Sequence, residues 1–334
     1  MNYKSAYPAI GRATVRHYLL ITLLAIFFTS CYHDVDMDRY RTPEEGNVLT
    51  LNSIISADTI VMAKASMPFF FTDEHEKTNY VTNLDIRLTV NGKYVETMRF
   101  DSASNFYISG YTAHPGDDIE LSTVYQGIEV TARDMVPIRP EIEEIKASVS
   151  TVDHDAHLIT YYITFTDNAA TEDYYFLGWD VDNRSTSVPR LDKHSPGYSQ
   201  EPVFQILADQ LKSAMPGWEP YRYDGLPFSD RGINGTRHTL TVTERVPGIL
   251  NFNAFRSIPR AIKLYSLSKD YYNFLLSMLV YEDASENGLH GGLIDLGLVE
   301  QEKVFTNIDG GVGVIGCCSL CEEYIDVLQL IADK

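Results

Sequence analysis

"NLDIRLTVNGKYVETMRF", residues 83–100, decides the class of fold. Apolar side chains occupy every second position of its first half, namely Leu84, Ile86, Leu88 and Val90. This two-residue period is typical of a β-strand with one buried face. Asn91-Gly92 then supplies the two positive-φ residues of a tight turn, and Tyr94, Met98 and Phe100 return on one face. The stretch therefore predicts a β-hairpin that lies against a core.

A second hairpin is predicted in residues 114–137, "HPGDDIELSTVYQGIEVTARDMVP", where Gly127 separates two alternating segments. Short strands at this spacing favour a β-sandwich of immunoglobulin-like or prealbumin-like type over residues 47–137. Pro137 and Pro140 follow. Because proline cannot donate a hydrogen bond to a central ladder, we expect a domain junction at this point.

The rest of the chain predicts a second β-rich domain of α+β type over residues 138–316. Its strands are expected near residues 142–151, 157–166 and 173–181. Residues 184–238 are rich in Pro, Gly, Asp and Tyr, which indicates a long insertion containing one short helix. A later strand leads to Ser268, which can cap a helix near the C-terminus. The fold class expected for the whole chain is mainly β.

Residues 310–316, "GGVGVIG", have the G-x-G-x-x-G spacing of dinucleotide-binding folds. Only 18 residues follow Gly316, too few for the helix and second strand that such a fold needs. We therefore expect a glycine-rich closing strand and no nucleotide cofactor. Residues 317–334 then form a tail with Cys317, Cys318 and Cys321. A local disulfide or free thiols are the favoured interpretation, and a metal or redox role is the alternative.

The chain has 27 basic and 46 acidic residues, a net charge of −19. Nucleic acid is therefore excluded as a partner, because its phosphates require a basic face. The 22 Tyr and 15 Phe residues favour strands over helices.

Residues 1–30 have the pattern of a signal peptide. Lys4, Arg12 and Arg16 precede the apolar run "YLLITLLAIFFTS", residues 18–30. A helix of thirteen residues rises about 20 Å, less than the ~30 Å core of a bilayer, so a permanent span is the weaker interpretation.

The signal peptide ends at "FTSC", which resembles the lipobox of bacterial lipoproteins, and Cys31 is the expected site of lipidation. Ordinary secretion with an incidental Cys31 is the alternative. Residues 31–46 form an acidic tether, and its segment "YHDVDMDRY" resembles the signal that exports Bacteroidota lipoproteins to the cell surface. A simple solvated tether is equally consistent with this composition. We expect anchoring in outer-membrane lipid through acylated Cys31 and exposure on the cell surface.

Three segments together carry a family resemblance: "KDYYNFLLSMLVYEDASENG", "VFTNIDGGVGVIG" and "FSDRGING". In this order they resemble a Bacteroidota lipoprotein family known as domain of unknown function 4249. The resemblance implies an outer-membrane lipoprotein, often encoded beside a TonB-dependent receptor. It carries over no catalytic residue.

The sequence names one candidate binding surface and no catalytic or metal site. Residues 218–228, "WEPYRYDGLPF", contain Trp218, Tyr221, Tyr223 and Phe228 among Pro and Gly. Such aromatic faces can stack on a sugar, a peptide or a partner protein, and the alternative is that they cover the edge of the core. The pair Ser266 and Lys269 has S-x-x-K spacing, but the companion motifs of penicillin-binding enzymes are missing.

These features favour a non-enzymatic binding or accessory protein that works with a TonB-dependent receptor in nutrient uptake. A surface hydrolase, acting on glycan or peptide through a carboxylate pair or a bound metal, is the alternative. A purely structural component of the surface layer is a third class.

Overall fold

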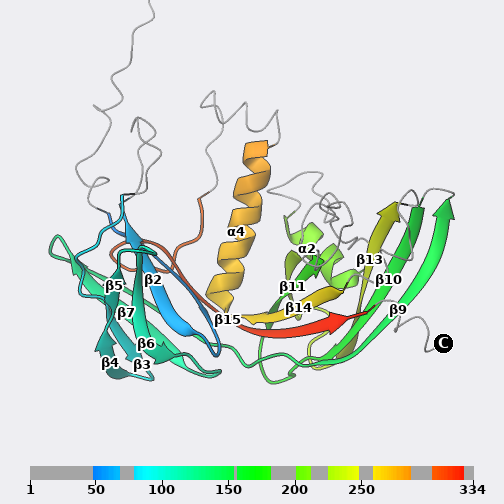
Figure 1. Ribbon diagram of the computed structural model, residues 1–334, viewed down its shortest axis with the longest axis horizontal. Helices are drawn as coiled ribbons and strands as arrows, with labels where there is room; N and C mark the ends of the chain where they lie inside the picture. The colour runs from blue at the N-terminus through cyan, green and yellow to red at the C-terminus, as the bar shows by residue number, and fades with distance from the viewer. Residues whose placement is uncertain are drawn as a thin grey trace, which may run out of the picture. The chain divides into compact units, whose positions relative to one another are not determined.

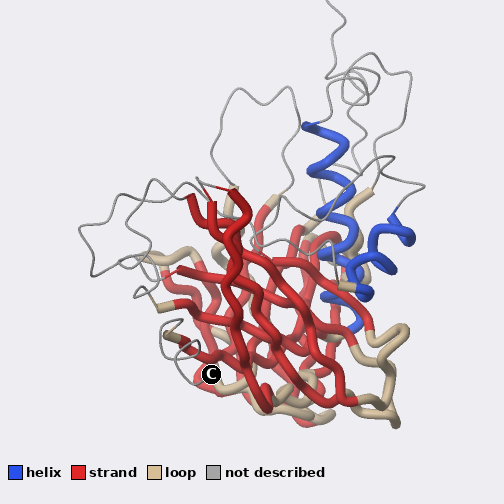
Figure 2. Tube along the Cα trace, turned by 90° about the vertical axis from the view of Figure 1, so that its right-hand side faces the viewer, coloured by secondary structure: helices blue, strands red, loops and turns tan. Residues whose placement is uncertain are grey.

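The computed structural model describes residues 48–67, 79–153, 156–181, 201–211, 225–247, 259–286 and 303–326. Most of these residues are in strands, as expected for a mainly β chain, and two helices accompany the sheets (Figures 1 and 2). All of them belong to one compact unit that begins at Gly46. Trp218, Tyr221, Tyr223 and Cys31 lie outside the described residues.

The first part of the unit is a sandwich of two sheets. One is a four-stranded sheet of β4 (Lys93–Thr97), β3 (Arg87–Val90), β7 (Asp118–Tyr125) and β8 (Ile128–Met135). The other side is formed by β1 (Thr50–Ser56), β2 (Ile60–Ser66), β6 (Phe106–Thr112) and β5 (Arg99–Asp101). Fully buried side chains from both sheets, such as Leu51, Val61 and Leu121, form the core between them. The immunoglobulin-like or prealbumin-like detail stays a prediction.

The hairpin predicted from residues 83–100 is confirmed, with one correction. Asn91 and Gly92 have φ of +52° and +72°, as the tight turn requires. The returning segment forms two strands. Its first part, β4, pairs with β3, and after Met98 the chain continues as β5 in the other sheet. A register shift between Leu88 and Thr89 precedes this change of sheet. Tyr94 is consequently 54% exposed and does not share the buried face of Met98.

The second part packs a three-stranded sheet against another set of strands. The sheet consists of β13 (Arg237–Pro247), β10 (Ala156–Thr166) and β9 (Ile142–Asp153). Facing it are β12 (Gly225–Ser229), β11 (Tyr174–Val181) and β14 (Arg260–Leu267), together with helix α2 (Pro202–Leu211). The insertion expected at residues 184–238 therefore includes α2, β12 and the start of β13. Leu207 of α2 and Phe228 of β12 belong to the main core, so these parts of the segment are integral to the fold.

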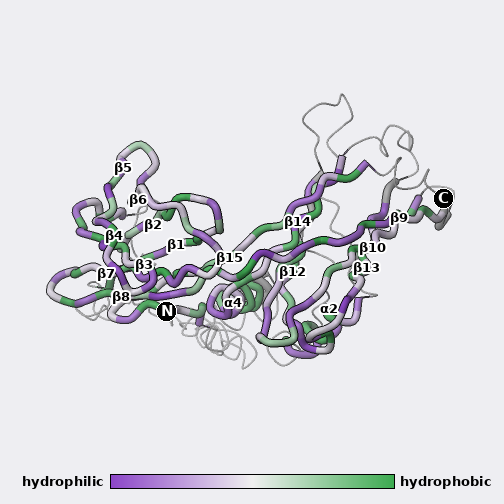
Figure 3. Tube along the Cα trace, turned by 90° about the horizontal axis from the view of Figure 1, so that it is seen from below, coloured by the Kyte–Doolittle hydropathy of each residue, from purple (hydrophilic) through white to green (hydrophobic). Residues whose placement is uncertain are grey.

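Strand β15 (Val312–Ile325) joins the two parts into one eight-stranded sheet of order β12-β11-β14-β15-β1-β2-β6-β5 (Figure 3). It pairs with β1 in parallel and with β14 in antiparallel fashion. Ile315 contributes to the core of the first part and Ile325 to that of the second. The boundary expected at residue 317 thus falls inside β15, and residues 317–325 are a central strand rather than a tail.

The glycines of residues 310–316 allow close approach of backbones, as the sequence predicts. Gly313 has φ of +114°, and a Cβ atom there would lie 2.2 Å from the carbonyl oxygen of Leu51. A Cβ at Gly316 would lie 2.8 Å from the side chain of Tyr271. Both distances are shorter than a carbon atom tolerates. Side chains at these two positions would therefore push β15 away from β1 and from Tyr271.

Helix α4 (Lys269–Glu286) begins beside β15 and rises away from it in the view of Figure 1. Ser268 caps it as predicted, because its hydroxyl oxygen accepts the N–H of Tyr271 at 3.2 Å. Tyr272 is buried and lies against Tyr174 of β11, with ring centroids 4.6 Å apart. Neither α4 nor any other helix in the described part of the chain is long and apolar enough to cross a bilayer.

Candidate functional site

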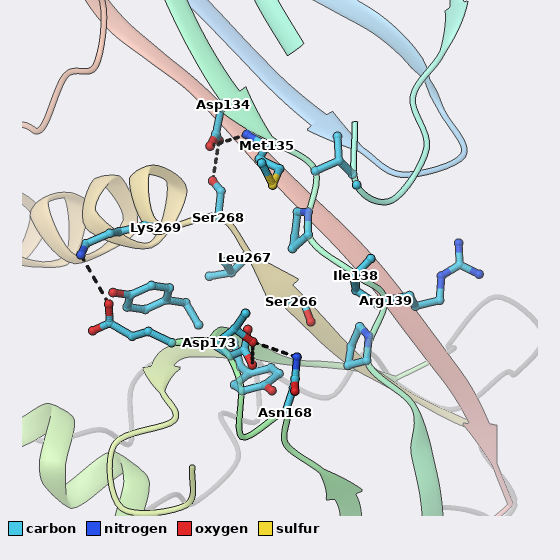
Figure 4. Close-up of a pocket in the computed structure, with 18 of the residues that line it drawn as sticks. Asp134, Met135, Ile138, Arg139, Asn168, Asp173, Ser266, Leu267, Ser268 and Lys269 are labelled. Atoms are coloured by element: carbon cyan, nitrogen blue, oxygen red, sulfur yellow. Dashed lines mark hydrogen bonds and ion pairs between the residues drawn. The ribbon is translucent and has the colours of Figure 1, made fainter. Parts of the chain in front are cut away.

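A pocket of about 760 Å³ lies where the sandwich meets the second part (Figure 4). Three segments form most of its wall: residues 134–141 at and after the end of β8, residues 166–175 around the β10–β11 connection, and residues 266–269 at the start of α4. Because these segments come from both parts of the unit, the pocket depends on their association through β15. Its volume lies within the 300–1,000 Å³ that is usual for small-molecule sites.

Asp134 is the central polar residue at the β8 side of the pocket. The Ser268 hydroxyl and the Cys317 N–H both donate hydrogen bonds to its Oδ2 atom, the second at 2.8 Å. The N–H of Met135 donates to Oδ1 at 2.8 Å. Burial raises the pKa of the Asp134 carboxyl to about 6, although these donors favour the ionised form. One carboxyl group thus connects β8, the cap of α4 and β15, and Figure 4 shows its hydrogen bond with Ser268.

The pocket wall combines exposed apolar groups with carboxylates. Met135 is 58% exposed and Ile138 is 71% exposed, so the wall presents two apolar side chains to solvent. The acidic lining residues are Asp134, Glu141, Glu172 and Asp173, and the basic ones are Arg139 and Lys269. Both cations are already paired, Arg139 with Asp58 and Lys269 with Glu172. The wall therefore favours a ligand that has an apolar part and carries hydroxyl groups or positive charge.

Asp167, Asp173 and Asp230 form a carboxylate cluster with oxygen atoms within 4.8 Å of one another. The Tyr175 hydroxyl donates to Asp167 at 2.7 Å, and the Gly235 N–H donates to the same carboxylate at 2.6 Å. Burial raises the pKa of Asp173 and of Asp230, and the charge of Asp167 adds to both shifts. Oxygen ligands of this kind are those that Ca²⁺ prefers, and Asp173 also lines the pocket.

Sequence reasoning missed this cluster because its members come from separate connections. Asp167 follows β10, Asp173 precedes β11 and Asp230 follows β12. The available signal was a pair of acidic turn sequences, "TDNAATED" at residues 166–173 and "SDRGING" at residues 229–235. The pairing of β11 with β12 and that of β10 with β13 bring the two turns together.

Phe228 is the one described member of the aromatic surface expected from the sequence, and its assignment was wrong. Its side chain is 0% exposed and belongs to the main core. The ring stacks on Tyr175 at a centroid distance of 5.3 Å and meets Phe204 edge-on at 5.4 Å. Phe228 therefore has no face left for a ligand, and the alternative interpretation, that it covers the core, holds for this residue.

The model of one protein family, "Domain of unknown function (DUF4249)", matches residues 35–322. The chain belongs to this family. No curated protein matches the DUF4249 chain significantly. Among solved structures it is similar to a glycosyl hydrolase family 2 member from Bacteroides cellulosilyticus DSM 14838, with 11% identity over 64% of this chain and 23% of the other, at a TM-score of 0.18.

A second similar structure is a putative membrane anchored protein from Corynebacterium diphtheriae. It has 10% identity over 66% of this chain and 54% of the other, at a TM-score of 0.20. The DUF4249 chain therefore spans about a quarter and about half the length of these two proteins. At these TM-scores neither structure carries an argument about fold or function.

Proposed function

We propose that this DUF4249 protein is a lipid-anchored, surface-exposed protein of the outer membrane that binds a small ligand and works with a TonB-dependent receptor in nutrient uptake. The observation that carries the binding role is the pocket between the two parts of the unit. Its exposed Met135 and Ile138 lie next to acidic residues within one concave site, so a ligand can make apolar and polar contacts there together.

The ligand class follows from the chemistry of the wall. Four carboxylates outnumber two cations that are already paired, so an anionic ligand would be repelled. A hydroxyl-rich or cationic molecule, such as an oligosaccharide or a basic peptide, can donate hydrogen bonds to these carboxylates. Its apolar faces can contact Met135 and Ile138.

Binding is tested by isothermal titration calorimetry with a panel of neutral oligosaccharides and basic oligopeptides. Ile138→Ser is the test variant, since this exposed side chain can lose its apolar contact without adding charge to the pocket. Val124→Ser is the matched control, because Val124 is 64% exposed on β7 and does not line the pocket. We expect Ile138→Ser to weaken a ligand at least about tenfold and Val124→Ser to leave its affinity unchanged. No binding by any panel member, or equal effects of the two variants, contradicts the proposal.

The membrane anchor is tested separately at Cys31. Cells that express the wild type or Cys31→Ser are grown with an alkyne-labelled fatty acid, and the purified protein is examined for label. We expect label on the wild type alone, together with digestion of the wild type by protease added to intact cells. Co-purification with a TonB-dependent receptor then tests the accessory role.

The carboxylate cluster supports the alternative function, a surface hydrolase acting on glycan or peptide. Asp173 faces the pocket and has a raised pKa, which suits a general acid. Against this, the Asp167 and Asp230 carboxylates already accept hydrogen bonds, Asp167 from the Tyr175 hydroxyl and the Gly235 N–H and Asp230 from the Asp173 N–H. Hydrolysis of a chromogenic glycoside or peptide that is lost in Asp173→Asn would favour the hydrolase over the binding protein.

A further inference from the structure

A second pocket, of about 640 Å³, lies on the outer face of the sandwich and shares no residue with the first. Strands β1, β2 and β6, the start of β15, residues 304–306 and one residue of α4 form its wall. The wall is largely apolar, with Ile54, Met62, Phe106, Phe274, Phe305 and Val312 as its main side chains. None of these six belongs to a buried core cluster of the described chain.

The exposure of these side chains is substantial. Ile54 is 47% exposed and Val312 is 37% exposed, although both belong to strands in the middle of the eight-stranded sheet. Covering such a wall removes its apolar surface from water, which favours a bound apolar group. The wall therefore suits an occupant that is itself mostly hydrocarbon.

Lys64 is the only charged residue among those that line this pocket. Its side chain is half-buried, and Nζ lies 4.3 Å from the ring centroid of Phe106 and 5.9 Å from that of Tyr80. No described carboxylate forms an ion pair with Lys64. By contrast Lys263, which is also a partly buried strand residue, forms ion pairs with Asp180 and Glu322. In a chain with 46 acidic and 27 basic residues, a half-buried lysine that has no carboxylate partner among the described residues stands out. It supplies the complementary charge for an anionic head group.

We propose that this pocket binds a free long-chain fatty acid, with the carboxylate on Lys64 and the alkyl chain along Ile54, Phe274 and Phe305. One positive charge on an otherwise uncharged apolar wall matches a single-chain monocarboxylate. The pocket volume lies in the range of small-molecule sites rather than of protein interfaces. This inference is independent of the ligand of the first pocket and of the anchor at Cys31.

The test uses the full-length protein in lipid nanodiscs and a palmitic acid analogue with a diazirine on its alkyl chain. After irradiation, the sites of attachment are mapped by peptide mass spectrometry. We expect attachment in the segments that contain Phe106, Phe274 and Phe305, and its suppression by unlabelled palmitate. Attachment elsewhere, or none, overturns the proposal.

Two variants and one analogue test the role of charge. Lys64→Met keeps the length of the side chain and removes its charge, and Lys93→Met does the same at an exposed lysine outside the pocket. We expect Lys64→Met to reduce attachment at least about fivefold, Lys93→Met to leave it unchanged, and hexadecanol to compete about tenfold less well than palmitate. Equal attachment in Lys64→Met and the wild type, or equal competition by hexadecanol, refutes a carboxylate site.

Two further measurements keep the outcome clear. Ile54→Asp places a negative charge on the wall at a side chain that already contacts solvent, so it tests the site even if Lys64→Met fails to fold. It should reduce attachment as strongly as Lys64→Met does.

A phosphatidylcholine with the same diazirine chain distinguishes a membrane lipid from a free fatty acid. If that lipid labels the pocket as efficiently as the fatty acid, the proposed occupant is wrong.

Discussion

The hydroxyl of Ser268 donates a hydrogen bond to Asp134, and the same oxygen accepts the N–H of Tyr271 at the first turn of α4. The cap of a helix in the second part is thereby connected to the last strand of the sandwich. Cys317 of β15 completes the arrangement, since its N–H also donates to Asp134. The first pocket lies directly at this connection, because Asp134 and Ser268 both line it.

The raised pKa of Asp134 predicts that the folded protein loses stability as the pH rises. Burial raises its pKa from an ordinary value of 3.8 to about 6 in the folded protein. Between these values the folded state holds a proton that the unfolded state has lost, so the stabilisation is complete below about pH 4 and is lost through pH 6. We expect the free energy of unfolding of the wild type, relative to Asp134→Asn, to fall by about 2 kcal/mol between pH 4 and pH 7.

Urea unfolding at a series of pH values measures this difference. Asp118→Asn is the control. The hydrogen bond from Arg133 lowers the pKa of Asp118, so the stability that Asp118 contributes changes with pH in the opposite direction. The contribution of Asp118 is present at neutral pH and is lost as the pH falls. A difference between the wild type and Asp134→Asn that is constant with pH would show that Asp134 does not titrate in this range.

Gly313→Ala should separate β15 from β1. Its φ of +114° disfavours any residue with a side chain, and the new Cβ would lie 2.2 Å from the carbonyl oxygen of Leu51. We expect a loss of at least about 3 kcal/mol in the free energy of unfolding, measured by urea titration.

Gly127→Ala isolates the cost of positive φ, because Gly127 has φ of +84° and a methyl group there would meet no atom within 4 Å. It should cost about 1–2 kcal/mol. Similar losses in the two variants would argue against the close contact.

The three cysteines of β15 should differ sharply in their reactivity. All three are free, Cys317 and Cys318 are buried, and Cys321 is partly exposed. Burial raises the pKa of Cys317, and it raises that of Cys318 to about 11, so both stay protonated near pH 8. Peptide mapping after brief treatment with iodoacetamide at pH 8 should find label on Cys321 alone. Rapid labelling of Cys317 in the native protein would contradict its burial.

The C-x-x-C spacing in this strand also excludes a local disulfide between Cys318 and Cys321. Three positions along a strand cover about 10 Å, and residues three apart face opposite sides of the sheet. A disulfide requires Cα atoms less than about 7 Å apart. The sequence favoured either a local disulfide or free thiols at these residues. In the structure all three cysteines are free thiols.

Local patterns predict the hairpins and helices of this chain because the deciding residues are neighbours in sequence. Asn91-Gly92 fixes the turn between β3 and β4, and Ser268 fixes the start of α4, within a few residues of each element. The parallel pairing of β15 with β1 joins Val312 to Thr50, which no local pattern encodes. Residues 317–325 consequently resembled a tail, although they complete the sheet.

The candidate site was less predictable for the same reason. The first pocket needs residues 134–141, 166–175 and 266–269 together, and the carboxylate cluster needs β11 beside β12. An aromatic residue such as Phe228 has the same sequence pattern whether it faces solvent or a core. Its burial is decided by Tyr175 and Phe204, which approach it only in the folded chain.

Arg260→Met should destabilise the second part strongly, because it leaves a carboxylate buried without its ion pair. Arg260 is 0% exposed, and its guanidinium lies 3.3 Å from the Glu244 carboxylate, whose side chain is 1% exposed. Removing one member of such a pair costs about 3–5 kcal/mol. Lys146→Met is the control, since the Lys146–Glu144 pair is exposed and its loss should cost less than about 1 kcal/mol. In urea titrations the double variant Arg260→Met/Glu244→Leu should recover most of the loss, because no charge then stays buried alone. If the double variant is as unstable as Arg260→Met, the loss comes from packing around Arg260 and not from the stranded Glu244 charge.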